Sequence, residues 1–226
     1  MIEFDALLFD FDGVLIESEF LGNKHIADFL TANGHPITPE ESMARFMGLA
    51  GQDFLNRVED FIGGPLPGNW NEARLAENER VLLEGVEEVV GAVAFVRSLP
   101  ADLPKAVVSS SSTRWISTHL RHLGLEDVFG DHLYSGGEHV TRGKPAPDLY
   151  LHGAAQLGVP IERCVILEDS PVGATGAVAS GAHVIGLCAG SHCALGHDER
   201  LRKIGVHTIA HDFEGVRRAL GLPASA

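Results

Sequence analysis

The chain places a short apolar run, Ala6-Leu7-Leu8-Phe9, directly before the segment Asp10-Phe11-Asp12-Gly13-Val14. A continuous apolar run of this length predicts a strand that is buried on both faces of a parallel sheet. Two carboxylates just beyond such a strand are costly to bury unless positive charge lies beside them. A divalent cation would supply that charge, because hard cations bind oxygen ligands. A turn that uses Asp and Gly explains the segment equally well, so both interpretations stay open here.

Further strands and helices alternate along the rest of the chain. Apolar runs that predict strands lie at residues 106–108, 164–167 and 184–187, with a weaker candidate at 132–134. Helical patterns lie at about 114–123, 148–157, 171–180 and 213–220. This alternation predicts an α/β fold in which helices cover both faces of a parallel sheet. In such a sheet, ligands bind beyond the carboxyl ends of the strands.

The alternation is interrupted by a stretch that predicts only helices. These lie at roughly 19–33, 39–45, 52–61 and 70–84, separated by segments rich in Gly and Pro. We therefore predict two parts: an α/β core formed by residues 1–16 and 86–226, and a helical cap formed by residues 17–85.

Composition and charge restrict the class of protein. The chain has 226 residues, of which 45% are hydrophobic and 21% charged, as in ordinary globular proteins. Lys and Arg number 17 against 31 Asp and Glu, which gives a net charge of −14. Such a charge argues against broad binding of nucleic acid or anionic membranes, because both require widespread positive charge. It leaves room for one small phosphate group, which needs only local donors.

Cysteine content and the amino-terminal residues bear on the compartment. The three cysteines, Cys164, Cys188 and Cys193, do not form the even set typical of a disulfide framework. The first residues lack the basic start of a secretory signal. Residues 170–197 carry no Asp, Glu, Lys or Arg, but their glycines favour a helix turn, a loop and a strand over a membrane span. We therefore expect a soluble cytoplasmic protein.

Three more polar segments adjoin predicted strands. Ser109 ends the second predicted strand and precedes a helix, so its hydroxyl could bind an anion or cap that helix. Lys144 lies among turn residues before a helix and could equally be an exposed loop lysine. Glu168 and Asp169 close an apolar strand, where acids also suit a helix N-terminus. Taken together, these segments and the first one predict a single ligand site at one edge of the sheet.

The four segments resemble the motifs of the haloacid dehalogenase (HAD) superfamily. Asp10-Phe11-Asp12-Gly13-Val14 resembles its first motif, and Ser109 matches the hydroxyl of its second. Lys144 matches its third motif, and Glu168-Asp169-Ser170 matches its acidic fourth. The helical insertion is similar to that of the C1-cap branch, in the β-phosphoglucomutase-like and sugar-phosphate phosphatase group. The resemblance implies a Rossmann-like parallel-sheet core covered by helices on both faces, with an all-helical cap inserted after the first strand.

The resemblance also implies a reaction, phosphoryl transfer through a phospho-aspartate on Asp10. Asp12 would protonate the leaving oxygen and then activate the water that hydrolyses the intermediate. Because dehalogenases of the superfamily lack this second acid, the chain resembles a phosphatase.

Phosphate-binding and metal-binding residues follow from the same resemblance. Ser109, the backbone at Ser110 and Lys144 would hold the phosphoryl oxygens. Mg²⁺ and Lys144 would offset the repulsion between a carboxylate nucleophile and an anionic substrate. The implied Mg²⁺ ligands are the carboxylate of Asp10, the backbone carbonyl of Asp12 and the carboxylate of Asp169, with Glu168 near or in the shell.

The cap lacks cations that other members of the branch use. In phosphoglucomutases of the branch, a cap arginine and a histidine after the first motif fall at positions that Gly51 and Gly22 occupy here. Phosphonoacetaldehyde hydrolases carry a Schiff-base lysine at the position of Gly51, whereas the one cap lysine here is Lys24. A sugar bisphosphate therefore has no obvious clamp for its second phosphate.

We accordingly expect a Mg²⁺-dependent phosphatase that hydrolyses a small phosphorylated metabolite, a sugar phosphate or a sugar-acid phosphate. The alternative within the family is a β-phosphoglucomutase-like isomerase. An alternative of another class is a binding module that has lost turnover. The expected partner is a small phosphomonoester, without nucleic acid or membrane, for a monomer or small homo-oligomer.

One further set of residues has spacings that resemble a zinc site, namely Cys188, His192, Cys193 and His197. Cys188 ends a predicted buried strand, where a free cysteine behaves as a small apolar residue. His192 and Cys193 are adjacent, so the loop must bend sharply for both to reach one ion. We expect a structural role for these residues and keep zinc binding as the alternative.

Overall fold

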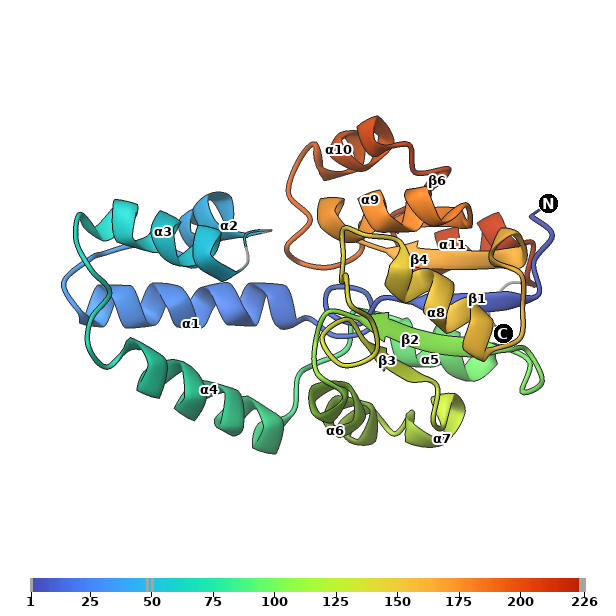
Figure 1. The fold of residues 1–226 in the computed structure, drawn as a ribbon, viewed down its shortest axis with the longest axis horizontal. Helices are drawn as coiled ribbons and strands as arrows, with labels where there is room; N and C mark the ends of the chain where they lie inside the picture. Colours follow the sequence, from blue (N-terminus) through green and yellow to red (C-terminus); the bar gives the residue numbers. More distant parts are fainter. Residues whose placement is uncertain (1, 48, 50, 224–226) are drawn as a thin grey trace. The chain divides into compact units, whose positions relative to one another are not determined.

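The computed structural model of the chain describes residues 2–47, 49 and 51–223, which form two compact units (Figure 1). The first, called the core unit here, comprises Met1–Glu17 and Val86–Ala226. The second, called the helical unit, comprises Ser18–Gly85. Residues 48 and 50, from the cap segment that precedes Gly51, lie outside the described residues.

The core unit is built on a parallel six-stranded sheet with the strand order β3-β2-β1-β4-β5-β6. Its strands are β1 (Ala6–Phe9), β2 (Lys105–Ser109), β3 (Leu133–Ser135), β4 (Cys164–Glu168), β5 (His183–Leu187) and β6 (Thr208–Ala210). Strand β1 pairs with both β2 and β4, so that Leu8 lies opposite Ala106 and Ile166. The five strands predicted from apolar runs are confirmed.

Helices cover both faces of this sheet, because alternate strand residues point to opposite sides. The core-unit helices are α5 (Ala92–Ser98), α6 (Thr113–Leu123), α7 (Glu126–Phe129), α8 (Asp148–Gln156), α9 (Pro171–Ser180), α10 (His197–Ile204) and α11 (Phe213–Leu220), with a 3₁₀ turn at Ile161–Arg163. Leu8 joins an apolar cluster with residues of α8 and α9. Phe9, facing the other way, contacts Phe95 of α5 and Phe129 of α7, with ring centroids 6.3 and 5.7 Å apart. Figure 1 shows α8 and α9 on one side of the sheet and α5 and α11 on the other. The predicted α/β fold class is therefore confirmed.

Two helices begin just beyond the carboxyl ends of strands because serines cap them. Ser112 accepts a hydrogen bond from the backbone N–H of Trp115 at 3.2 Å and starts α6. Ser170 accepts one from Gly173 at 3.0 Å and starts α9, with Pro171 in the first turn as expected. These caps bring the chain back over the sheet within a few residues of β2 and β4.

The helical unit consists of α1 (Ser18–Ala32), α2 (Pro39–Phe46), α3 (Gly51–Ile62) and α4 (Trp70–Glu84). All four helices were predicted, each to within a residue at either end. A capping box formed by Thr38 and Glu41 starts α2. The rings of Phe54 and Phe61 meet that of Phe46 edge-on, at centroid distances of 6.1 and 6.0 Å. Aromatic packing of this kind supplies the unit with an apolar centre of its own.

Four elements were not predicted from the sequence, namely α5, α7, α10 and β6. Helices α5 and α10 follow Gly91 and Gly196, which provide no side-chain cap for a helix start. Strand β6 has only three residues, and α7 only four. Helices α5 and α10 therefore lack the usual start signal, and α7 and β6 are too short to show a periodic pattern.

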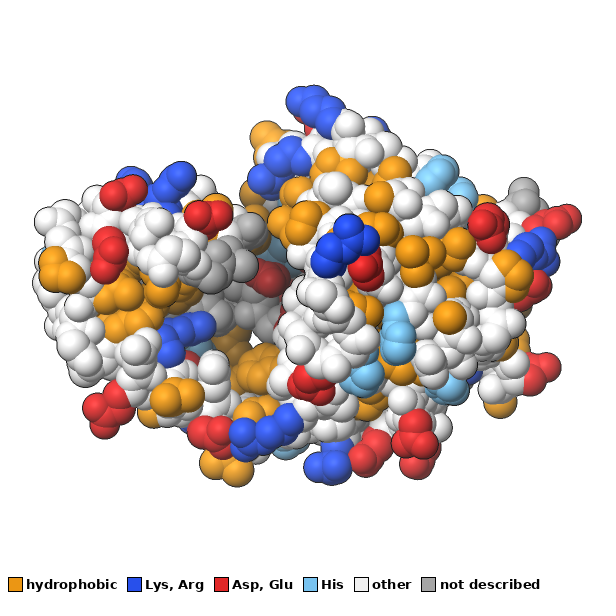
Figure 2. Space-filling view, in the orientation of Figure 1, with side chains coloured by type: hydrophobic (Ala, Val, Ile, Leu, Met, Phe, Trp, Pro, Cys, Tyr) orange, Lys and Arg blue, Asp and Glu red, His pale blue; other side chains and the backbone are white. Residues whose placement is uncertain are grey.

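The surface shows mixed charge. On the face in Figure 2, Lys and Arg side chains are scattered among Asp and Glu instead of gathering into one basic patch. Among the helices of the described residues, none has both the length and the apolar character needed to cross a lipid bilayer.

Candidate active site

The predicted polar segments meet at the carboxyl edge of the sheet. Asp10 follows β1, while Ser109 and Glu168 end β2 and β4, the two strands that flank β1. The carboxylates of Asp10, Glu168 and Asp169 each offer an oxygen within 4.8 Å of the other two, and all three residues are buried. Asp10 and the adjacent pair Glu168 and Asp169, far from it in the sequence, thus form one buried cluster.

Lys144 lies between two of these acids. Its Nζ is 2.7 Å from Oδ1 of Asp10 and 2.7 Å from Oε1 of Glu168, and its side chain is only 4% exposed. Burial disfavours the charged amine, but the two carboxylates outweigh burial and keep the pKa of Lys144 well above its usual value. Lys144 is therefore a buried, fixed cation, and the interpretation as an exposed loop lysine is wrong.

Glu168 is held by several donors. Besides Lys144, the hydroxyl of Tyr150 donates to its Oε1 at 3.0 Å. The backbone N–H and the hydroxyl of Ser170 donate to its Oε2 at 2.8 and 3.1 Å. Burial alone would raise the pKa of Glu168, but Lys144 and the Ser170 N–H lower it overall. Glu168 is thus an ionised group that orients Lys144.

The pKa of Asp10 is shifted in the opposite direction to that of Glu168. Burial, reinforced by the nearby charge of Glu168, raises the pKa of Asp10 well above its usual value, and Lys144 only partly opposes this. With Asp169, the cluster carries three formal negative charges against the single positive charge of Lys144. Three buried carboxylates are the oxygen-rich, electron-hard donor set that suits Mg²⁺. The residues present therefore fit a divalent cation.

Asp12 faces a different set of partners. Its Oδ2 accepts hydrogen bonds from the hydroxyls of Ser111 at 2.6 Å and Ser109 at 3.3 Å. Its Oδ1 accepts one from Nε1 of Trp115 at 3.0 Å. The carboxylate is thus turned toward the start of α6. Ser110, the next residue along, is exposed.

Asp169 is contacted by His192, on the loop between β5 and α10, and by His197, the first residue of α10. Nε2 of His192 lies 2.8 Å from Oδ2 of Asp169, and Nε2 of His197 lies 2.5 Å from its backbone oxygen. The loop also brings Cys193 close, with its Sγ 3.4 Å from Nε2 of His192 and hydrogen-bonded to Cys188. The sharp bend needed for a zinc site therefore exists, but the histidine nitrogens that such a site would use are directed at Asp169.

Several of these contacts were not foreseen. The partners that sequence reasoning missed are Tyr150, Ser111 and Trp115, and the role of His192 and His197 toward Asp169. Trp115 follows Ser112 by three residues, in the first turn of α6, which places it beside the strand end. The two histidines stood out in the sequence only through their spacing with the cysteines.

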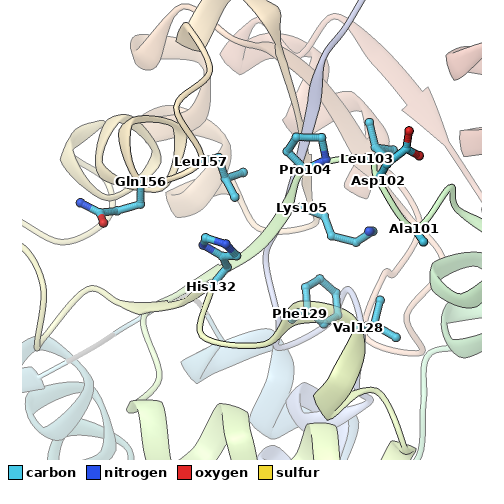
Figure 3. A pocket seen from close by; sticks show the side chains of 10 residues that line it. All are labelled: Ala101, Asp102, Leu103, Pro104, Lys105, Val128, Phe129, His132, Gln156 and Leu157. Carbon is cyan, nitrogen blue, oxygen red and sulfur yellow. The ribbon is translucent and has the colours of Figure 1, made fainter.

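A separate hollow of about 340 Å³ lies at the opposite, amino-terminal edge of the sheet. Figure 3 shows Lys105, Phe129 and His132 among the side chains around it. It lies at the amino edge because residues 101–105 lead into β2 and His132 leads into β3. None of the predicted site residues lines it.

Comparison with known proteins identifies the family. Residues 4–181 match the family model described as haloacid dehalogenase-like hydrolase. The chain belongs to this family. It is therefore a hydrolase, as the four motifs predicted.

Named relatives of this hydrolase span most of its length. It is 30% identical over 193 residues to the 6-phosphogluconate phosphatase of Escherichia coli, covering 85% of this chain and 86% of that protein. It is 32% identical over 183 residues to hexitol phosphatase A of the same organism, covering 80% and 81%. Among solved structures, a HAD family hydrolase from Deinococcus radiodurans with bound phosphate and sodium matches with a TM-score of 0.85, 30% identity and full coverage of both chains.

Proposed function

We propose that this hydrolase is a Mg²⁺-dependent phosphatase that cleaves a sugar phosphate or sugar-acid phosphate through a phospho-aspartate on Asp10. The observation that carries the proposal is the buried lysine at the acid cluster, because Lys144 lies 2.7 Å from the carboxylate of Asp10. A cation in contact with a buried carboxylate can hold an anionic substrate against an anionic nucleophile. The names of the two Escherichia coli relatives support a phosphorylated sugar or sugar derivative as the substrate.

Asp10 would act as the nucleophile. Its carboxylate oxygen forms a bond to phosphorus while the bond from phosphorus to the substrate's ester oxygen breaks. Lys144 contacts both Asp10 and Glu168. Its ammonium group can therefore bind a phosphoryl oxygen while it stays paired with Glu168. Water then attacks the phospho-aspartate, which releases phosphate and regenerates the Asp10 carboxylate.

Asp12 would act as the general acid and then as the general base. It gives a proton to the leaving ester oxygen and later takes one from the attacking water. In the structure, the hydroxyl of Ser109 donates to Asp12. We infer that a bound phosphoryl group takes over this hydroxyl, together with the backbone N–H of Ser110, so that Oδ2 of Asp12 accepts one hydrogen bond fewer while it keeps the bond from Ser111.

The cation site proposed for Mg²⁺ consists of the carboxylates of Asp10 and Asp169 and the backbone carbonyl of Asp12. Glu168 borders this site through its contact with Lys144. When bound, Mg²⁺ supplies positive charge that offsets the repulsion between the substrate and Asp10. Burial is the first cause of the raised pKa of Asp10 and the charge of Glu168 the second, and a bound cation would oppose the second.

Hydrolysis is favoured over the mutase alternative by the helical unit. Gly22 lies in α1 and has no side chain, so it cannot supply the expected mutase histidine. Lys24 is exposed and pairs with Asp28 at 2.6 Å. Neither of these two positions therefore supplies an obvious clamp for a second phosphate.

The test is free-phosphate release from a panel of phosphorylated metabolites. The panel holds hexose, pentose and sugar-acid phosphates, phosphoglycolate and glycerol phosphate, each with Mg²⁺ or with EDTA. We expect release that needs Mg²⁺ and is lost in Asp10→Asn, but persists in Asp102→Asn, an exposed aspartate at the amino edge. Conversion of hexose 1-phosphate to 6-phosphate with added bisphosphate, without phosphate release, would instead establish the mutase. A protein that binds these esters without turnover would be the binding module.

A further inference from the structure

We propose that His192 is a positioning residue that holds the carboxylate of Asp169 in the orientation in which Asp169 binds the divalent cation. The inference rests on the cation site of the proposed function and is independent of which phosphate ester is hydrolysed. It concerns a residue outside the four motifs, on the loop between β5 and α10.

The contact between His192 and Asp169 is short and buried. Nε2 of His192 lies 2.8 Å from Oδ2 of Asp169, and each side chain is only 2% exposed. A carboxylate oxygen accepts hydrogen bonds, so Nε2 of His192 carries the proton and donates it. Hydrogen bonds to a charged acceptor are among the stronger ones, particularly where water is excluded. The bond therefore fixes the rotation of the Asp169 carboxylate.

Two glycines lie directly against the side chains of His192 and Asp169, where any larger residue would collide with them. A Cβ atom on Gly190 would lie 2.5 Å from Cε1 of His192. A Cβ on Gly13 would lie 2.9 Å from the same atom and 2.2 Å from Oδ2 of Asp169. Gly13 also has a φ of +79°, which favours glycine independently of space. The imidazole and the carboxylate are thus enclosed on two sides by backbone.

The start of α10, which follows this loop, holds the backbone of Asp169 as well. Nη2 of Arg200 lies 3.1 Å from Nδ1 of His197, and because a guanidinium only donates, this nitrogen of His197 is the acceptor. The proton of His197 is therefore on Nε2, which donates to the backbone oxygen of Asp169 at 2.5 Å. One histidine of the loop and one at the start of α10 thus hold the side chain and the backbone of the same acid.

The loop is anchored next to His192. The backbone N–H of Ser191 donates to the carboxylate of Glu17 at 3.1 and 3.0 Å, and its hydroxyl donates at 2.6 Å. Both residues belong to the core unit. His192 is therefore presented to Asp169 from a fixed backbone.

The functional consequence follows from the demands of the ion. Mg²⁺ requires near-ideal octahedral geometry, so a carboxylate that can rotate binds it less well. Partners that orient metal ligands without touching the metal typically contribute about 10–100-fold to metal affinity. Because His192 holds Oδ2 of Asp169, the direction of Oδ1 of Asp169 is fixed as well. We assign this contribution to His192.

The test measures binding of Mn²⁺, an ion with the same preference for oxygen ligands, to the metal-stripped full-length protein without substrate. Free Mn²⁺ is followed by electron paramagnetic resonance, and Mg²⁺ is then used as a competitor. We expect His192→Leu to bind Mn²⁺ about 10–100-fold more weakly. His192→Gln, whose side-chain amide can still donate, should recover most of the affinity. His183→Leu, at the other end of β5, should bind as the wild type does.

A second variant covers the case in which His192→Leu does not fold, as judged by circular dichroism. Gly190→Ala removes no buried group but pushes against the His192 ring, so it should also weaken Mn²⁺ binding. Gly64→Ala is its control, since a Cβ there has nothing within 4 Å. Wild-type affinity in folded His192→Leu, or in Gly190→Ala when His192→Leu is unfolded, would overturn the proposal.

The outcome is separable from that of the proposed function. If Mn²⁺ binding depends on His192 and no phosphate ester is hydrolysed, the positioning role stands and the proposed phosphatase activity fails. If phosphate is released with Mg²⁺ but the Mn²⁺ affinity does not depend on His192, the phosphatase activity stands and the positioning role fails.

Discussion

Two buried lysines, one at each edge of the sheet, behave differently. Lys144 at the carboxyl edge contacts two carboxylates at 2.7 Å, and its pKa is held well above the usual value. Lys105 begins β2 at the amino edge, is 6% exposed and donates to the backbone oxygen of Pro100 at 3.3 Å. Burial lowers the pKa of Lys105, and Asp102 only partly compensates.

The difference shows that burial of a charge does not by itself make a site. The hollow at the amino edge lies beside Lys105 (Figure 3), whereas the convergent charges surround Lys144. Opposite charges fixed around a cation produce a field that is already oriented before a substrate arrives. A lone buried amine next to a carbonyl produces only a desolvation cost.

The largest expected effect comes from Lys144→Met. The substitution removes the cation next to Asp10, and loss of one preorganised charged donor typically lowers kcat by about 10²–10³-fold. Steady-state phosphate release at saturating Mg²⁺ measures the loss, with circular dichroism to confirm folding. A loss below about tenfold would remove the basis for contrasting the two edges.

His119 extends the comparison to a buried base for which burial outweighs the nearby charge of Asp12. It is 0% exposed, its ring packs on Trp115 with centroids 4.3 Å apart, and burial lowers its pKa to about 4. The unfolded chain therefore binds a proton near pH 6.5 that the folded chain takes up only near pH 4. Stability contributed by the neutral ring is present above about pH 6.5 and is lost as the pH falls toward 4, by about 2 kcal/mol at pH 5.

The measurement is urea unfolding at pH 7.5 and pH 5 for the wild type and His119→Leu. The variant should lose about 2 kcal/mol less than the wild type between the two pH values. Equal losses in both proteins would show that the folded chain protonates His119 as readily as the unfolded chain does.

Trp115→Phe tests the donors around Asp12. The substitution removes the Nε1–H that holds Oδ1 of Asp12 and keeps an aromatic ring against His119. If Asp12 is the general acid, phosphates with poor leaving groups should lose about tenfold in kcat, a small part of what general acid catalysis provides. Release from p-nitrophenyl phosphate should change little, because its leaving group needs no proton. Equal losses on both substrates would assign Trp115 a merely structural role.

The smallest effect is expected from Lys105→Met. Methionine keeps an unbranched apolar side chain of similar length, and only the hydrogen bond to the backbone oxygen of Pro100 is lost. We expect unchanged phosphate release and a change in unfolding free energy below about 1.5 kcal/mol. A loss of activity comparable to that of Lys144→Met would break the contrast between the two edges.

The sequence predicted the site residues that follow strands more readily than their partners. Asp10, Ser109 and Glu168 follow apolar runs, so parallel-sheet topology alone brings them to one edge. Tyr150 and Trp115 lie inside helices, and their hydrogen bonds to Glu168 and Asp12 depend on how α8 and α6 pack. No local pattern encodes such contacts.

The loop after β5 shows the same limit. The spacing of His192 and His197 with the cysteines predicts a possible metal set, and the structure does bring these side chains together. Their hydrogen bonds to Asp169 arise because β5 lies next to β4 in the sheet. Strand order is a long-range property, so the direction of these rings could not be predicted from spacing.

The strand order has a further consequence, for synthesis of the chain. Strand β1 pairs with β2 and β4, and its partner Cys164 in β4 is made long after Ala6. At about 5–20 residues per second, the ribosome needs on the order of 10–30 seconds to reach it. The helical unit, whose contacts are local, can fold in that interval, while the edge of β1 that pairs with β4 stays without its partner. An open edge of an apolar strand can pair with another chain, so the central strand of the finished sheet is exposed to aggregation during synthesis.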